Sequence, residues 1–323
     1  MISHKIATRA TAAFLLLIAA TATMAQERYP SRPIEVVVPW GPGGGSDQTA
    51  RRLTHYLEPA LKVSFPVVNV PGASGLTGIT KILGAPADGY TIGVTGDIYA
   101  PMGTPGAKWK LSDFQPLAIV ISQPGGFFTA QDSRFRTWAD FEKEARTKPG
   151  TLKIAFVGFN SIDEIHINNL IAKGIKVIAV PFAKPGERYA SVLGGHADLV
   201  YEQAGDIKSY IENKQMRPLL SVSEKRFPAY PEIPTAREAG IDITVPQFRW
   251  VFMRGGTDPK RAQVVADAIA RFAATPEFKK SLADEMADPN SFVPMGEAPK
   301  NFERTLEALR REAAAAGMKT VER

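Results

Sequence analysis

The fold of this chain is constrained most strongly by two glycine-rich turns, each of which separates a strand-like segment from a helix-like segment. The first turn, PWGPGGGSD at residues 39–47, follows the β-branched run IEVVV and precedes leucines at a spacing of four. The second turn, NVPGASG at residues 69–75, follows a strand-like run over residues 63–68 and opens another amphipathic helix. A third strand over residues 90–95 ends just before Asp97. This βαβαβ order predicts a parallel sheet with helices packed on it.

The remainder of the chain continues the alternation of strands and helices without repeating the sequence. We expect further strands over residues 117–122, 127–130, 152–157, 176–182, 199–201, 218–222 and 245–253. We expect further helices after the N-cap pair Thr137 and Asp140, over residues 189–193, from Asp258 and Pro259 onward, and over residues 301–316.

No linker marks a domain boundary, and the composition is that of two α/β lobes on one chain. We assign residues 26–120 and 248–323 to lobe 1 and residues 121–247 to lobe 2. The segments near residues 117–130 and 218–250 are then expected to cross between the lobes.

The N-terminus has the layout of a signal peptide. Lys5 and Arg9 precede the apolar run TAAFLLLIAAT, and Thr23 and Ala25 follow it with the spacing of a cleavage site. We expect residues 1–25 to be removed after Ala25, because the run is too short to anchor the protein in a bilayer. A short buried helix is the alternative. No other stretch has 18 consecutive apolar residues, so we expect the mature protein to be soluble.

The composition argues against several kinds of site. The formal net charge of +6 falls to +4 when Lys5 and Arg9 leave, and the remaining basic residues are scattered, which argues against a nucleic-acid groove. Cysteine is absent, which removes disulfides and thiolate nucleophiles. The four histidines lack the spacing of metal ligands. We therefore expect no metal, no cofactor and no nucleic-acid partner.

The two glycine-rich turns are candidates for an anion site. Turns that follow parallel strands gather at the carboxyl edge of the sheet, where backbone N–H groups and helix N-termini converge. Glycine permits close approach and a positive φ, and each helix N-terminus carries about half a positive charge. Together the turns predict a site for one carboxylate or phosphate. Two tight turns without a ligand remain the alternative.

An enzyme is the second possibility, and the motifs that would support it are missing. Ser46 and Ser74 both fail the G-x-S-x-G frame, no P-loop pattern is present, and the glycines at 41–45 do not give G-x-G-x-x-G. A structural or adhesion module would explain neither the glycine turns nor the alternation of strands and helices. We therefore expect a binding protein and not an enzyme.

Several strings of the sequence carry a resemblance to a known family. They are YPSRPIEVVVPWGPGGGSDQTAR from residue 29, NVPGASGLTG from residue 69, PADGYTIGV from residue 86, LGGHADL from residue 193, RPLLSVSEKR from residue 217 and PEIPTAREAGID from residue 231. In order and spacing they resemble the solute-binding proteins of tripartite tricarboxylate transporters, the Bug family. The resemblance covers nearly the whole chain after residue 28.

The resemblance implies a bilobal periplasmic binding protein, type II like, with a ligand cleft between two α/β lobes. It also implies a monomer that delivers a small carboxylate to the permease subunits of a membrane transporter. In this family the two glycine loops grip a ligand carboxylate through backbone amides and ordered water. The positions that match are Trp40, Gly43, Gly44, Gly45, Ser46, Asp47, Gly72, Ala73, Ser74 and Gly75. Asp97, at the end of the third strand, joins them as a candidate.

The second half of the site departs from the family. Where many relatives have a turn rich in glycine and serine, this chain reads VGFNSIDEIH at residues 157–166. The candidates from this lobe and from the crossover strand are Phe159, Asn160, Ser161, Asp163, Phe182, Tyr201, Glu202 and Phe248. Asp163 could face the ligand and accept from an amine or hydroxyl, or it could stabilise a helix N-terminus. His166 is expected to be a packing residue. The class of carboxylic acid stays open, with aromatic acids, dicarboxylic acids and amine-bearing acids all considered.

Overall fold

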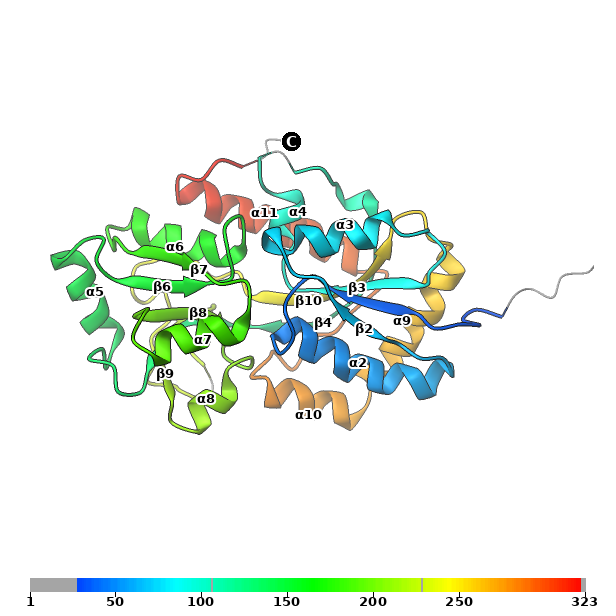
Figure 1. Ribbon diagram of the computed structural model, residues 1–323, viewed down its shortest axis with the longest axis horizontal. Coiled ribbons are helices and arrows are strands. Elements are labelled where there is room, and N and C mark those ends of the chain that lie inside the picture. The colour runs from blue at the N-terminus through cyan, green and yellow to red at the C-terminus, as the bar shows by residue number, and fades with distance from the viewer. Residues whose placement is uncertain (1–27, 106, 228, 321–323) are drawn as a thin grey trace, which may run out of the picture.

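The computed structural model describes residues 28–105, 107–227 and 229–320. These residues form two α/β lobes that lie side by side, each built on one sheet (Figure 1). The predicted signal peptide, residues 1–25, lies outside the described residues.

The first sheet has six strands. They are β1 (Glu35–Val38), β2 (Val67–Asn69), β3 (Thr91–Thr95), β4 (Phe114–Gln123), β10 (Gln247–Arg254) and β11 (Val293–Pro294). Their order is β11-β4-β10-β3-β1-β2. Strand β1 is parallel to both β2 and β3, whereas β10 is antiparallel to β3 and β4. The parallel βαβαβ unit predicted from the two glycine turns is therefore confirmed.

Helices cover both faces of this sheet. They are α2 (Gly45–Leu61), α3 (Leu76–Gly84), α4 (Tyr99–Met102), α9 (Pro259–Ala273), α10 (Pro276–Asp284) and α11 (Ala298–Ala315), with 3₁₀ turns η1 (Ala73–Gly75) and η2 (Leu111–Asp113). Successive residues of a strand point to opposite faces, so Val36 and Val38 pack with α2 and α9 while Val37 packs with α3 and α11. This double burial explains why the strand reads as an unbroken apolar run.

The second sheet has five strands. They are β5 (Gly125–Ala130), β6 (Lys153–Phe156), β7 (Ile178–Pro181), β8 (Leu199–Gln203) and β9 (Met216–Val222). Their order is β7-β6-β8-β5-β9, with β6 parallel to β7 and β8. The helices of this lobe are α5 (Trp138–Thr147), α6 (Ile162–Ala172), α7 (Pro185–Leu193) and α8 (Lys208–Glu212).

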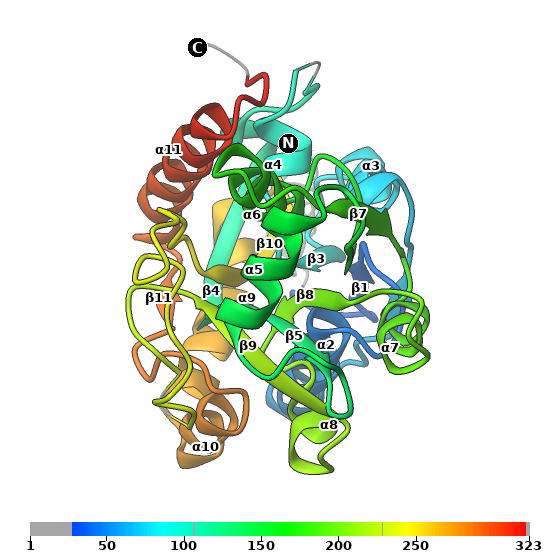
Figure 2. The same cartoon turned by 90° about the vertical axis from the view of Figure 1, so that its left-hand side faces the viewer.

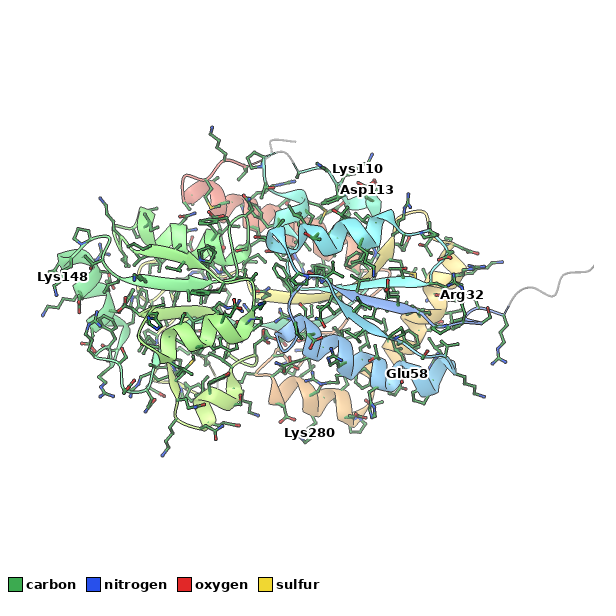
Figure 3. All side chains as sticks on the ribbon, in the orientation of Figure 1. Arg32, Glu58, Lys110, Asp113, Lys148 and Lys280 are labelled. Atoms are coloured by element: carbon green, nitrogen blue, oxygen red, sulfur yellow. The ribbon has the colours of Figure 1, made fainter. Side chains whose placement is uncertain are left out.

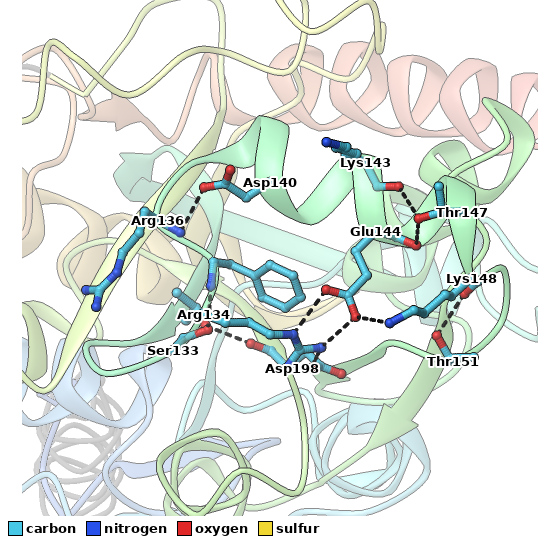
Figure 4. A network of polar contacts seen from close by, with 12 residues as sticks. Ser133, Arg134, Arg136, Asp140, Lys143, Glu144, Thr147, Lys148, Thr151 and Asp198 are labelled. Carbon is cyan, nitrogen blue, oxygen red and sulfur yellow. Dashed lines mark hydrogen bonds and ion pairs between the residues drawn. The ribbon is translucent and has the colours of Figure 1, made fainter.

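Helix α5 begins where the sequence predicted it. The Thr137 side chain accepts the backbone N–H of Asp140, and the Asp140 carboxylate accepts the backbone N–H of Thr137, which is a capping box. Arg134 then pairs with Glu144 of α5 and with Asp198 just before β8 (Figure 4). These contacts fix α5 beside the start of β8, the central strand of the second sheet.

The chain crosses between the sheets twice. Only Pro124 separates the end of β4 from the start of β5, and residues 223–246 connect β9 to β10. Helix α11 also reaches the other lobe, because it packs on the first sheet and contacts α6 of the second (Figure 2). The C-terminal helix therefore spans both lobes on the side of the crossovers.

Most strand boundaries lie within a few residues of the predictions, and the second strand differs most. The sequence predicted residues 63–68, whereas β2 covers Val67–Asn69. The carbonyls of Ser64 and Pro66 accept the N–H groups of Ile34 and Val36, but Pro66 has no N–H to donate in return, and the ladder with β1 begins at Val67. The short elements α8, α10 and β11 were not predicted.

Charged side chains of both signs lie around the periphery of the molecule, as the lysines, the arginine and the two acids labelled in Figure 3 illustrate. Within the part of the chain that the structure describes, no helix is both long enough and apolar enough to cross a membrane.

Candidate functional site

A cavity of about 50 Å³ lies between the two lobes. It is lined by the residues that follow strands β1, β3, β6, β7 and β8 and by the start of β10. Ligands of open α/β sheets bind outside the carboxyl ends of the strands, and here that edge of one sheet faces that edge of the other. The cavity is therefore the candidate ligand site.

Seven of the residues proposed from the sequence line this cavity. They are Trp40, Gly44, Gly45, Ser46, Asp97, Asp163 and Glu202. Gln203, which the sequence offers at the same strand end as Tyr201 and Glu202, also lines the cavity. Seven further lining residues were not proposed. They are Val157, Ala183, Pro185, Arg188, Asp206, Gln247 and Arg249.

The other proposed residues surround the cavity without lining it. They are Gly43, Asp47, Gly72, Ala73, Ser74, Gly75, Phe159, Asn160, Ser161, Phe182, Tyr201 and Phe248. Several of them hold the lining residues in place, as the following contacts show.

The first glycine turn is fixed by Asp47. Its Oδ2 accepts the N–H of Gly43 at 2.9 Å and the Nε–H of Arg51 at 3.0 Å. Its Oδ1 accepts from Asn69, which also donates to the backbone carbonyl of Trp40. Burial raises the pKa of Asp47, but these hydrogen bonds hold it below the ordinary value. Asp47 therefore stays charged and binds the first turn to the second.

The second glycine turn contacts the opposite lobe. Ala73 and Ser74 both have positive φ, 47° and 53°, within a turn that the flanking Gly72 and Gly75 make possible. This conformation directs the Ser74 hydroxyl to the backbone carbonyl of Phe159 in the second lobe. The turn therefore closes one side of the cleft.

Arg249 and Asp206 form a buried ion pair against the first turn. Arg249 Nη2 donates to Asp206 Oδ2 at 2.7 Å, and Gln123 donates to Asp206 Oδ1 at 3.0 Å. A Cβ atom on Gly45 would lie 2.1 Å from Arg249 Nη2 and 2.2 Å from Asp206 Oδ2. Here, the groups that come closest to the bare backbone of Gly45 are thus side chains of the protein itself.

A second buried ion pair lies on the side of lobe 2. Arg188 donates to Glu202 Oε2 and to the backbone carbonyl of Phe182, and the Tyr189 hydroxyl also donates to Glu202. The Glu202 Oε1 atom accepts the N–H of Gln203. This carboxylate is therefore fully hydrogen-bonded before any ligand arrives.

Asp97 connects the two lobes. Its Oδ1 accepts the N–H groups of Tyr99 and Ala100 at 2.7 and 3.3 Å, and its Oδ2 accepts the N–H of Ile162 at 3.2 Å. Burial raises the pKa of Asp97 to about 6, although all three N–H donors oppose the rise. The carboxyl group thus links the end of β3 to the N-terminus of α6.

Both roles considered for Asp163 have structural counterparts. It lies in the first turn of α6, where Ser161 is the N-cap, and it also lines the cavity. Its Oδ2 accepts the N–H of Val157 at 3.0 Å. Burial, with Glu202 nearby, raises its pKa to about 7, and Arg188 opposes that rise.

The proposed aromatic residues divide between cavity, core and surface. The Trp40 ring lines the cavity and its indole N–H donates to Thr95. Tyr201 is buried and its hydroxyl contacts His166, which also contacts Glu312, so His166 is a hydrogen-bonded packing residue as expected. Phe159 is 53% exposed and packs edge-on against Phe156.

The missed residues carried a weak sequence signal. Asp206 follows the end of β8 just as Asp97 follows β3, so the argument from strand ends applies to both. Arg249 interrupts the largely apolar strand QFRWVFM. A charged residue at such a position indicates a buried charge that has a partner. The sequence does not show that these two side chains meet.

Of the residues that the structure describes, no group of three or more His, Asp and Glu side chains is arranged to hold a metal ion.

Comparison with known proteins agrees with this architecture. Residues 49–294 match the family described as tripartite tricarboxylate transporter family receptor. The chain is 27% identical to Protein BugT of Bordetella pertussis, over 81% of this chain and 87% of that protein.

Solved structures share the fold. A Rhodopseudomonas palustris protein, Rpa4515 with adipate, has a TM-score of 0.83 at 22% identity and covers 90% of this chain and 98% of its own. MatC from the same organism with bound malate has a TM-score of 0.79 at 22% identity, over 89% of this chain and 100% of its own. The matched family is one of transporter receptors and not a family of enzymes. The chain belongs to the receptor family of tripartite tricarboxylate transporters, with Bug proteins among its relatives.

Proposed function

We propose that this protein captures a small carboxylate in the cleft between its lobes and delivers it to the permease subunits of a tripartite tricarboxylate type transporter in the membrane. The observation that carries the proposal is the interlobe cavity itself, where the N-terminus of α2 and the buried Arg188 and Arg249 side chains meet. Helix N-termini and guanidinium groups both favour a carboxylate.

Related proteins support the choice of ligand class. Structural relatives have been solved with adipate and with malate, which are both small carboxylic acids. We extend that class to this chain, with the residues named from the two glycine turns and from the second lobe as its proposed binding residues. Residues that do not line the closed cavity, such as Ser74 and Phe159, act by closing the cleft around the ligand.

Capture requires the cleft to open. A cavity of about 50 Å³ has room for a few water molecules only. Contacts between the lobes must break for a larger molecule to enter, among them those of Asp97 with Ile162, Ser74 with Phe159, and Arg249 with Asp206. Residues 26–120 and 248–323 would then move as lobe 1 against lobe 2, residues 121–247, about the two crossovers.

We place this function in the periplasm. Cleavage near Ala25 would release a monomeric protein into the periplasm, where its partners are the carboxylate and the permease. No nucleic acid, cofactor or metal takes part in this function.

A thermal-shift screen of the mature protein, residues 26–323, tests the proposal. A carboxylate present at 100 times its Kd stabilises the folded state by about 2.7 kcal/mol, whereas neutral sugars of similar size leave the midpoint unchanged. Turnover of a stabilising acid by the purified protein, or no stabilisation by mono-, di- and tricarboxylates and amino acids, would contradict it.

A further inference from the structure

The interlobe cavity contains more buried acids than buried bases. The carboxyl groups that line it are those of Asp97, Asp163, Glu202 and Asp206, and the guanidinium groups are those of Arg188 and Arg249. If every group is charged, the lining carries two more negative than positive charges. A positive charge on the ligand would offset this excess of negative charge.

Arg249 has hydrogen-bonding capacity to spare. Its side chain is 2% exposed, and Nη2 donates to Asp206. Its Nε and Nη1 atoms are buried and have no hydrogen-bond partner among the residues that the structure describes. The guanidinium group lies between two glycines, since a Cβ on Gly45 would be 2.1 Å from Nη2 and one on Gly96 would be 2.7 Å from Nη1. A carboxylate is the acceptor that a guanidinium group prefers, so Arg249 offers a ligand carboxylate a place beside the N-terminus of α2.

The four acids differ in how many hydrogen-bond donors their carboxylate oxygens already have. Glu202 accepts from Arg188, Tyr189 and Gln203, and both oxygens of Asp97 accept backbone N–H groups.

Asp163 has fewer partners. It accepts one hydrogen bond, at Oδ2, so its Oδ1 has no donor in the described part of the chain. Both oxygens of Asp206 accept hydrogen bonds, from Arg249 and from Gln123, although a ligand carboxylate would compete for Arg249. Binding of a carboxylate alone would leave Asp163 without a positive partner.

We propose, on the basis of the function proposed above, that the ligand is a small acid that also carries an ammonium group. Its carboxylate binds Arg249 beside the α2 N-terminus, and its ammonium group binds Asp163. A dicarboxylate without an amine would add two negative charges to a cavity that already has an excess of acids, and such a ligand is discriminated against.

Matched pairs of ligands test this selectivity on the unaltered mature protein. Calorimetry at pH 7.5 compares alanine with propionate, aspartate with succinate, and glutamate with glutarate, since the members of each pair differ by one amine. We expect at least one amine-bearing acid to bind tenfold or more tightly than its partner. Amine-free acids that bind as tightly as their partners, or more tightly, overturn this inference and leave carboxylate capture intact. If no carboxylate of any kind binds, the proposed function fails as well.

A pair of single variants locates the selectivity. Asp163→Asn should reduce the preference for the amine at least tenfold, and the affinity for the amine-free acid should rise or stay the same. Glu164→Gln is the matched control, because Glu164 lies in the same turn of α6 but does not line the cavity. Its carboxylate accepts the backbone N–H of Asn160. Equal preferences in Asp163→Asn and the wild type would contradict the role of Asp163.

The double variant Arg249→Gln with Asp206→Asn tests the carboxylate anchor. Both charges of the buried pair are removed together, so neither is left without its partner. We expect a loss of at least 100-fold in affinity for the amine-bearing acid, with an unchanged circular dichroism spectrum. A folded double variant with wild-type affinity overturns the inference. If the double variant does not fold, the ligand pairs and Asp163→Asn still decide it.

Discussion

Gly45 illustrates how a residue can be important for a reason that its sequence context does not show. The glycine-rich turn predicts close approach of something to the backbone, and the ligand was the expected partner. In the closed cleft the space beside Gly45 is taken by Arg249 and Asp206, which come from the crossover strand and from the second lobe. The glycine therefore accommodates an ion pair that spans both lobes.

We predict that Gly45→Ala destabilises the protein by about 1–3 kcal/mol, because the new methyl group overlaps the ion pair. It should also weaken ligand binding, since the pair lines the cavity. Gly186→Ala is the control: Gly186 also lies in the first turn of a helix, and its Cβ would meet no atom within 4 Å. That variant should gain up to about 1 kcal/mol. Urea denaturation measures the free energy of unfolding of both variants. Equal stability of Gly45→Ala and Gly186→Ala would contradict the predicted overlap with the ion pair.

The buried acids predict a dependence of stability on pH. The pKa of Asp163 is raised to about 7 in the folded protein by burial, so the folded state holds a proton that the unfolded state has released. The free energy of unfolding should therefore fall as the pH rises from about 5 to 8, by on the order of 2–4 kcal/mol for this group. Asp163→Asn should flatten that slope in urea titrations at pH 5, 6, 7 and 8. The same slope in both proteins would show that Asp163 does not titrate in this range.

Helices and strands were predicted correctly from the sequence where the signal lies in a short continuous stretch. The alternation of apolar runs and turns predicted the parallel unit β1–α2–β2–α3–β3, and Thr137 with Asp140 predicted the start of α5. Asp97 and Glu202 were proposed because they follow the ends of predicted strands, and both line the cavity. Arg249, Asp206 and Arg188 were missed, since which side chains of two lobes meet depends on packing between segments far apart in the chain.

Helix α11 offers a test of how the crossover segment is held. Glu312 Oε1 accepts the N–H groups of Thr244 and Val245 in the second crossover, and its Oε2 contacts His166 of α6. Glu312→Ala leaves these buried groups without a partner and should cost about 2–4 kcal/mol of stability. It should also speed amide hydrogen exchange at Thr244 and Val245.

The matched control is Glu307→Ala, because Glu307 is exposed on the same helix. This variant should lie within about 0.5 kcal/mol of the wild type. If the Thr244 and Val245 amides exchange as slowly in Glu312→Ala as in Glu307→Ala, Glu312 does not hold the crossover segment.

For the molecule as a whole, ligand capture depends on hinge motion. The two lobes are in contact through, among others, Asp97 and Ile162, Ser74 and Phe159, and Arg249 and Asp206. Small-angle scattering should therefore give a larger radius of gyration for the free protein than for the protein saturated with its acid. A radius that stays constant up to saturation would argue against closure on the ligand.

A crystal structure of the mature protein, bound to the acid for which it has the highest affinity, tests whether a small carboxylate binds between the lobes. We expect the ligand carboxylate to lie within hydrogen-bond distance of the backbone N–H groups at residues 44–46 or of the Arg249 guanidinium, with both lobes in contact with the ligand. A ligand bound to one lobe alone, or at a surface away from the edges where the two sheets face each other, would contradict the claim.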